Sequence, residues 1–132
     1  EYCQPGRGYD IGVSGGRYYG VCSAELEPGV LDAYNAGHHL HTLRANVSRA
    51  SSAIGSREHE LEDVEEEIRS KEAALIAPET TVEDRVLLLA DLKALAERTG
   101  ELDVEIQLLY EERARYQAEL DNYEASVASF TY

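Results

Sequence analysis

The stretch Leu75-Ile76-Ala77-Pro78-Glu79-Thr80-Thr81-Val82 joins two long segments, residues 28–77 and 82–130, that contain few other Gly or Pro residues. Pro78 cannot continue a helix, because it lacks the backbone donor and clashes with the preceding turn. The run Thr80-Thr81-Val82-Glu83-Asp84 offers an N-cap threonine with an acidic residue three positions later, which favours the start of a new helix. A connection this short returns the second helix antiparallel to the first. We therefore predict helices over residues 28–77 and 82–130, joined by a turn at 78–81.

Both long segments repeat their apolar residues at alternating spacings of four and three, which is typical of a coiled coil. In the first segment, one set is Leu40, Val47, Ile54, Leu61, Ile68 and Leu75, and a second set three residues later is Leu43, Ala50, Arg57, Val64 and Lys71, with two polar interruptions. In the second segment, the two sets are Leu88, Leu95, Leu102, Leu109, Tyr116, Tyr123 and Phe130, and Leu92, Thr99, Ile106, Arg113, Leu120 and Val127. Folding the chain about Pro78 makes Ile54 face Leu102 and Leu40 face Tyr116. We expect an all-α fold, consisting of a long antiparallel two-helix coiled-coil hairpin with a small disulfide-closed, Gly/Tyr-rich N-terminal head.

The head covers residues 1–27, and residues 28–132 form the hairpin. Cys3 and Cys22 are the only cysteines, and neither stands in the CxxC or His spacing of a zinc site. A bond between them closes a loop of roughly 20 residues, for which loop entropy gives about 3 kcal/mol. The segment between them is rich in glycine and would hold no fixed shape without such a link. We predict a disulfide between Cys3 and Cys22, and therefore an oxidising compartment.

The charge balance restricts the possible partners. The chain has 26 acidic and 12 basic residues, which give a net charge of −14. Nucleic-acid binding needs clustered Lys and Arg, so we expect no nucleic-acid partner and no contact with an anionic membrane surface. An acidic surface favours a basic protein partner without identifying one.

Aromatic residues concentrate at the two ends of the sequence. Tyr2, Tyr9, Tyr18, Tyr19 and Tyr34 lie near the start, whereas Tyr116, Tyr123, Phe130 and Tyr132 lie near the end. Antiparallel folding brings the two groups to the same end of the hairpin. We expect a small aromatic core there, in which the disulfide-closed head packs on the two helix ends.

The head carries a loose repeat, Tyr9-Asp10-Ile11-Gly12 and Tyr34-Asn35-Ala36-Gly37. An aromatic residue followed by small residues at three-residue spacing gives a short helix one smooth face, so another backbone approaches closely. With the frame Tyr2-Cys3, Gly8-Tyr9, Gly12, Gly15, Gly20-Val21-Cys22 and Tyr34, residues 1–45 resemble DUF2799, a family of predicted bacterial lipoproteins of unknown function. The resemblance implies an exported, lipid-anchored envelope protein and no catalytic residues. Glu1 leads directly into Tyr2-Cys3, so we expect a mature or trimmed form whose export signal lay upstream.

Three motifs suggest chemistry, and each has a simpler interpretation. Gly12-Val13-Ser14-Gly15-Gly16 matches the nucleophile elbow of hydrolases, but that elbow needs a parallel sheet for which a helical hairpin has no room. His38-His39-Leu40-His41 offers imidazoles for a transition metal, but no carboxylate or thiol is fixed beside them. The acidic run at residues 58–67 is typical of a solvated helix face. We therefore expect no enzyme activity, no cofactor and no metal site.

The end of the hairpin carries more apolar side chains than one helix seam covers. We call this region the tip, and assign partner binding there to Leu75, Ile76, Leu87 and Leu89. The alternatives are self-association through the tip, contact with another protein, or a locally thicker core within one chain. The leading hypothesis is a non-enzymatic interaction or scaffold protein of the periplasm or cell envelope. The second is an immunity or inhibitor protein that binds an exported toxin.

Overall fold

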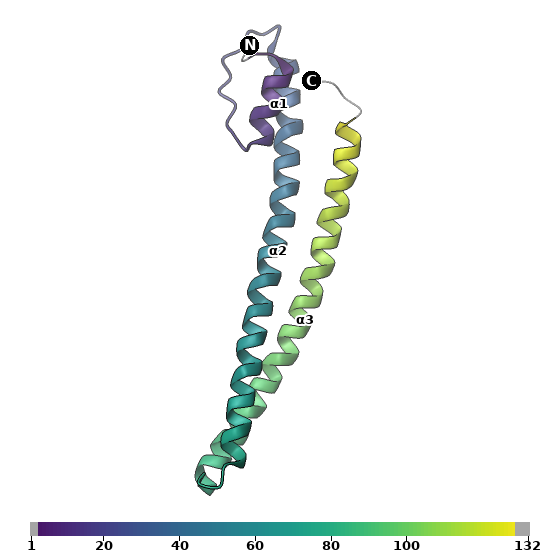
Figure 1. Ribbon diagram of the computed structural model, residues 1–132. Helices are drawn as coiled ribbons and strands as arrows, with labels where there is room; N and C mark the ends of the chain where they lie inside the picture. Colours follow the sequence, from purple (N-terminus) through teal and green to yellow (C-terminus); the bar gives the residue numbers. More distant parts are fainter. Residues whose placement is uncertain (1–2, 129–132) are drawn as a thin grey trace. The chain divides into compact units, whose positions relative to one another are not determined.

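The computed structural model describes residues 3–128 and contains three helices. They are α1 (Pro5–Val13), α2 (Glu27–Ile76) and α3 (Val82–Val127), as Figure 1 shows. No strand occurs among the described residues, so this part of the chain is all-α. The chain divides into two compact units. Unit 1 comprises Glu1–Arg49 and Glu112–Tyr132, and unit 2 comprises Ala50–Glu111.

Unit 1 holds α1, the first part of α2 and the last part of α3. Helix α1 lies alongside α2 (Figure 1), and the two are in backbone contact. The core of this unit is a leucine cluster of Leu40, Leu43 and Leu120, with Tyr9, Val13, Val47 and Tyr123 packed against it. The expected aromatic core is therefore a leucine core bordered by two tyrosines, and Tyr19 is 72% exposed. Tyr2, Phe130 and Tyr132 lie outside the described residues.

Unit 2 holds the rest of α2 and α3, which run antiparallel on either side of the turn (Figure 1). Its buried apolar side chains are Ala50, Ile54 and Val64 on α2 and Leu102 on α3, and Leu102 is completely buried. All four occupy positions of the four-three series of their segments. The seam between the two helices is therefore formed by the residues that the spacing predicted.

The turn between α2 and α3 combines the predicted cap with a contact that the sequence analysis missed. Thr81 caps α3, because its Oγ1 accepts a hydrogen bond from the Asp84 backbone N–H at 3.1 Å. The guanidinium of Arg85 donates to the carbonyl oxygens of Leu75 and Ala77, at 3.1 and 2.9 Å. Leu75 lies in the last turn of α2 and Ala77 directly follows the helix, so neither carbonyl has a partner within α2, and Arg85 of α3 supplies a donor to both.

The two-helix description needs one correction, because the head itself contains helix α1. Pro5 stands at the first position of α1, where its missing N–H costs no hydrogen bond. The head thus consists of a short helix and a loop. Helix α2 begins at Glu27 and ends at Ile76, one residue before the predicted bound at each end. Helix α3 ends at Val127, and the predicted end at residue 130 lies outside the described residues.

The pairing of the two long helices also differs from prediction, by about one heptad. Leu40 was expected to face Tyr116, but the aromatic residue in its cluster is Tyr123, seven positions later. In unit 2, Lys71 Nζ pairs with Asp91 at 3.1 Å, whereas folding about Pro78 would have placed it opposite Arg85. The reason is that a seven-residue repeat slides by seven without exposing an apolar residue, so the pattern cannot fix the register. The contacts of Arg85 place the centre of the turn beyond Pro78.

Candidate functional site

The contact between α1 and α2 is built from glycines at equivalent positions of the Tyr-x-x-Gly repeat. A Cβ atom on Gly12 would collide with the carbonyl oxygen of Tyr34, and one on Gly37 would collide with the carbonyl oxygen of Tyr9. One turn earlier, a Cβ on Gly8 would lie 2.6 Å from the carbonyl oxygen of Val30. Only glycine allows two backbones to approach this closely. The prediction of a smooth helix face with a close backbone neighbour is therefore confirmed.

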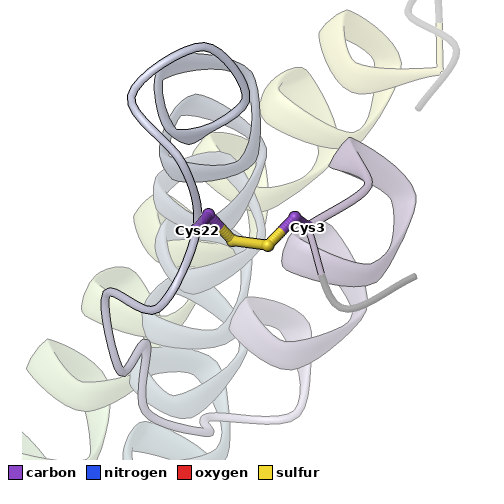
Figure 2. Close-up of a disulfide and its surroundings, with 2 residues drawn as sticks. All are labelled: Cys3 and Cys22. Atoms are coloured by element: carbon purple, nitrogen blue, oxygen red, sulfur yellow. A yellow bond between two sulfur atoms is a disulfide. The ribbon is translucent and has the colours of Figure 1, made fainter.

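The disulfide closes the head around this helix contact. Cys3 and Cys22 are bonded, with their Cα atoms 5.5 Å apart, as predicted. Figure 2 shows that the bond links the segment before α1 to the loop that leads into α2. The disulfide therefore holds the start of the head next to the loop between α1 and α2.

Helix α1 ends in a Schellman motif, which needs a glycine. Gly15 adopts φ +80°, a conformation that other residues rarely adopt, and its N–H donates to Gly12 O at 3.0 Å. The Gly16 N–H donates to Ile11 O at 2.8 Å, so both bonds of the motif are present. The Tyr34 hydroxyl of α2 then donates to Gly16 O at 3.0 Å and holds the end of the motif against α2.

Ser14, the residue of the nucleophile-elbow match, lies at this helix end. Its Oγ donates to Ile11 O at 2.9 Å, as a helix-terminal serine commonly does. The motif follows no strand, because residues 3–13 contain only a turn and α1. Ser14 therefore lies at a helix end and lacks the strand-to-helix turn on which a nucleophile elbow depends.

The three histidines of α2 near residue 40 have three different surroundings. His41 Nδ1 donates to Val13 O, a C-terminal carbonyl of α1, at 3.2 Å. The ring of His38 lies between those of Tyr34 and His41, at centroid distances of 5.8 and 6.2 Å. The ring of His39 meets Tyr123 of α3 edge-on at 4.6 Å. Across residues 3–128, no group of three or more His, Cys, Asp or Glu side chains is arranged to hold a metal ion.

An open groove in unit 1 begins beside His39, between α2 and α3. It is lined by His39, Leu43, Glu119, Asn122, Tyr123 and Ser126. Leu43 is part of the leucine core, and the ring of His39 rests on Tyr123. The groove is therefore the outer margin of that core.

The acidic run at residues 58–67 lies on an exposed face of α2, as its simpler interpretation predicts. Arg98 of α3 reaches the run and donates to Glu60 at 2.7 Å, and it also pairs with Glu101 and Glu105. The hydrogen bond to Glu60, followed by the charges of Glu60 and Glu105, raises the pKa of Arg98 against the effect of desolvation. Arg57 pairs with Glu105 at 3.3 Å. Because these ion pairs are half-exposed, each adds little to the free energy of unfolding. Their main effect is to favour one alignment of α2 against α3.

The tip residues predicted to bind a partner are mostly exposed. Ile76 is 80% exposed, Leu87 is 64% exposed and Leu89 is 55% exposed, whereas Leu75 is half-buried. A locally thicker core within one chain would have covered these three side chains. Three of the four predicted residues are therefore available to another molecule.

This apolar surface continues along α3, which was not predicted from the sequence. Val82, Val86, Val104 and Leu108 are each more than half exposed, and all lie on α3 within unit 2. On α2, no large apolar residue between positions 50 and 75 is comparably exposed. The outward face of α3 thus carries exposed large apolar residues, whereas the exposed face of α2 carries the acidic run. The signal in the sequence is the 18-residue spacing of Val86 and Val104, which is five helical turns and places both on one line.

The described residues define an all-α protein with a disulfide-closed head locked to α2 by glycines. The family model of DUF2799, a family of proteins of unknown function, matches residues 1–39. The match confirms the resemblance seen in the Tyr/Gly frame and supports membership of this chain in the DUF2799 family. The matched segment contains α1, both cysteines and both copies of the repeat. No curated protein and no solved structure matches the chain significantly.

None of the three helices combines the length and the apolar composition that crossing a lipid bilayer requires, within the residues that the structure describes.

Proposed function

We propose that this protein is a non-enzymatic interaction or scaffold protein of the bacterial cell envelope, acting through its paired helices α2 and α3. The observation that carries the proposal is the uneven distribution of exposed apolar side chains. Eight of the eleven large hydrophobic residues that are strongly exposed among the described residues lie in unit 2. The same unit has seventeen acidic and six basic residues, so its exposed apolar side chains stand out on a strongly charged surface. Apolar patches kept on so charged a surface mark contact sites.

In this proposal, α2 and α3 pair as an antiparallel coiled coil. The four-three spacing of their apolar residues supports this packing. Ile54, Val64 and Leu102, which are buried in unit 2, all occupy positions of that series. A coiled coil presents long outward faces that are free for partners, which suits a scaffold.

The proposed location is the periplasm, with a lipid anchor in the full-length form. The disulfide between Cys3 and Cys22 supports an oxidising compartment, because reducing conditions in the cytosol would open it. The resemblance to predicted lipoproteins supports the anchor. Fractionation of cells that produce the full-length precursor, with labelled fatty acid, tests both statements. Label in the protein and recovery with membranes would support them, whereas an unlabelled cytosolic protein would contradict them.

The tip is the proposed docking site for a protein partner. A photo-crosslinking amino acid placed at Leu87 in living cells should trap a discrete protein, because this side chain is 64% exposed at the tip. Leu26, which is 54% exposed in unit 1, provides a matched control position. If positions 26 and 87 trap the same background, or neither traps a protein, the tip is not a docking site.

A second candidate function is an immunity or inhibitor protein that covers a basic site of an exported toxin. The observation that favours it is the excess of acidic residues in unit 2, where seventeen face six basic ones. Such a complex would form rapidly at low salt and weaken steeply as salt is added. A strongly basic partner trapped at position 87, with toxicity that this protein abolishes, would favour inhibition over scaffolding.

A further inference from the structure

The exposed face of α3 that points away from α2 has a self-complementary order of residues. We define this outer face by Val82, Val86, Ala90, Lys93, Glu97, Gly100, Val104 and Leu108, all of which are exposed. It runs for about 40 Å at the helical rise of 1.5 Å per residue. All eight residues belong to unit 2.

The order is symmetric about residue 95. Val82 corresponds to Leu108 and Val86 to Val104, so large apolar residues match large apolar residues. Because 18 residues make five turns, every matched pair also lies at mirror-related angles about the line through Val86 and Val104. A two-fold axis perpendicular to α3 would therefore bring each residue opposite its match on a second copy. Such self-complementarity is what an isologous dimer interface requires.

The centre of the face matches in size and in charge. Ala90 would meet Gly100 of the second copy, and a Cβ on Gly100 has no atom within 4 Å in the single chain, so two helices can approach closely there. Lys93 would meet Glu97 of the second copy, and the two-fold axis repeats this pair. Neither Lys93 nor Glu97 forms an ion pair within residues 3–128. The two charges that interrupt the apolar face thus have opposite sign at matching positions.

We propose that two copies of this protein associate through the outer faces of α3, in antiparallel orientation, with reciprocal Lys93–Glu97 pairs at the centre. This inference deepens the proposed scaffold function, on which it rests, by assigning the second copy as the partner of one face. It moves self-association away from the tip residues Ile76 and Leu87, which stay available to a different protein. The acidic face of α2 lies on the side away from this interface, so its charges oppose the dimer only weakly at physiological salt.

The first test is the molar mass of charge-swap variants of the full chain in solution, by sedimentation equilibrium. The wild type should have twice the chain mass of 14.6 kDa. Lys93→Glu places four like charges at the centre and should weaken the dimer by about tenfold or more. The double variant Lys93→Glu/Glu97→Lys exchanges the two charges and should restore the wild-type mass. All substituted residues are exposed, so helicity should not change.

Leu87→Glu is the matched control, since it changes the charge of an exposed residue of α3 that lies outside the outer face. Its mass should equal that of the wild type. A monomeric wild type would overturn the proposal. So would a dimer that Lys93→Glu leaves intact, or a double variant that remains monomeric.

The second test is zero-length carbodiimide crosslinking of an equal mixture of ¹⁴N- and ¹⁵N-labelled protein. Lys93 and Lys71 are the only lysines, so the products are simple to assign. A Lys93–Glu97 product of mixed isotopic mass can form only between two chains, and we expect it. Products of unmixed mass alone would overturn the antiparallel pairing. If the protein is a monomer but still traps a protein at position 87, the dimer is wrong and the proposed scaffold function stands. If the protein is a dimer but traps nothing at position 87, the dimer stands and the proposed docking function of the tip is wrong.

Discussion

Gly12 of α1 and Gly37 of α2 are equivalent positions of one repeat, and each lies against the backbone of the other copy. The carbonyl oxygen of Tyr34 occupies the space that a side chain on Gly12 would need, and that of Tyr9 occupies the space beside Gly37. The two copies of Tyr-x-x-Gly therefore pack on each other reciprocally. This contact and the Cys3–Cys22 bond define the matched segment of the chain as a folded element.

Gly12→Ala should destabilise unit 1, because the new methyl group meets backbone atoms of Tyr34 and His38 that cannot turn aside. Overpacking of this kind costs about 1–3 kcal/mol. Gly55→Ala is the control, because a Cβ there has no neighbour within 4 Å, and it should stabilise the protein by up to about 1 kcal/mol. Urea unfolding of both variants measures the difference. Equal effects of the two substitutions would contradict the close contact of α1 with α2.

Cys3→Ser/Cys22→Ser should loosen the head and leave unit 2 unchanged. The bond spans 19 residues, and closing a loop of this length contributes roughly 3 kcal/mol in the chain-entropy account. Residue-resolved hydrogen exchange should show that α1 loses protection while residues 50–111 keep theirs. Protection of α1 that survives removal of the disulfide would show that the glycine contact alone holds the head.

Arg85→Ala should weaken the end of α2, because the carbonyls of Leu75 and Ala77 lose their charged donor. The expected loss in the free energy of unfolding is about 1–3 kcal/mol. Arg69→Ala removes an arginine whose pair with Glu66 lies on one exposed helix face, and it should change the stability little. Thermal unfolding of the two variants provides the measurement. If both melt alike, the turn does not depend on Arg85.

Local rules were enough to predict where α2 begins and ends and where α3 begins. Pro78 excludes a helix at its own position, and Thr81 caps the start of α3. The residues next to the turn were therefore enough to predict where one long helix ends and the other begins. The close contact of α1 with α2 could be predicted because glycines at a regular helical spacing indicate that another backbone packs against them. Each of these signals lies within a few residues of its effect.

Long-range pairing could not be predicted in the same way. Leu40 finds an apolar partner at Tyr116 or at Tyr123, since both belong to the same series, and the choice depends on the turn. The role of Arg85 at the turn required knowing where the α2 carbonyls lie in space. Val104 and Leu108 could not be predicted as a surface, because the four-three spacing indicates only the side of each helix that faces the seam. The outer face of α3 follows only from the exposure of these side chains in the folded chain.

The antiparallel pairing of α2 with α3 is the central claim, and Lys71 offers its most direct test. Lys71 Nζ lies 3.1 Å from the Asp91 carboxylate across the two helices, and 4.0 Å from Glu67 on its own helix. Carbodiimide treatment of dilute protein, followed by peptide mass spectrometry, should therefore yield an intrachain Lys71–Asp91 link beside the local Lys71–Glu67 link. A link from Lys71 to Glu83 or Asp84 instead of Asp91, or a Lys71–Asp91 link found only between chains, would contradict the pairing.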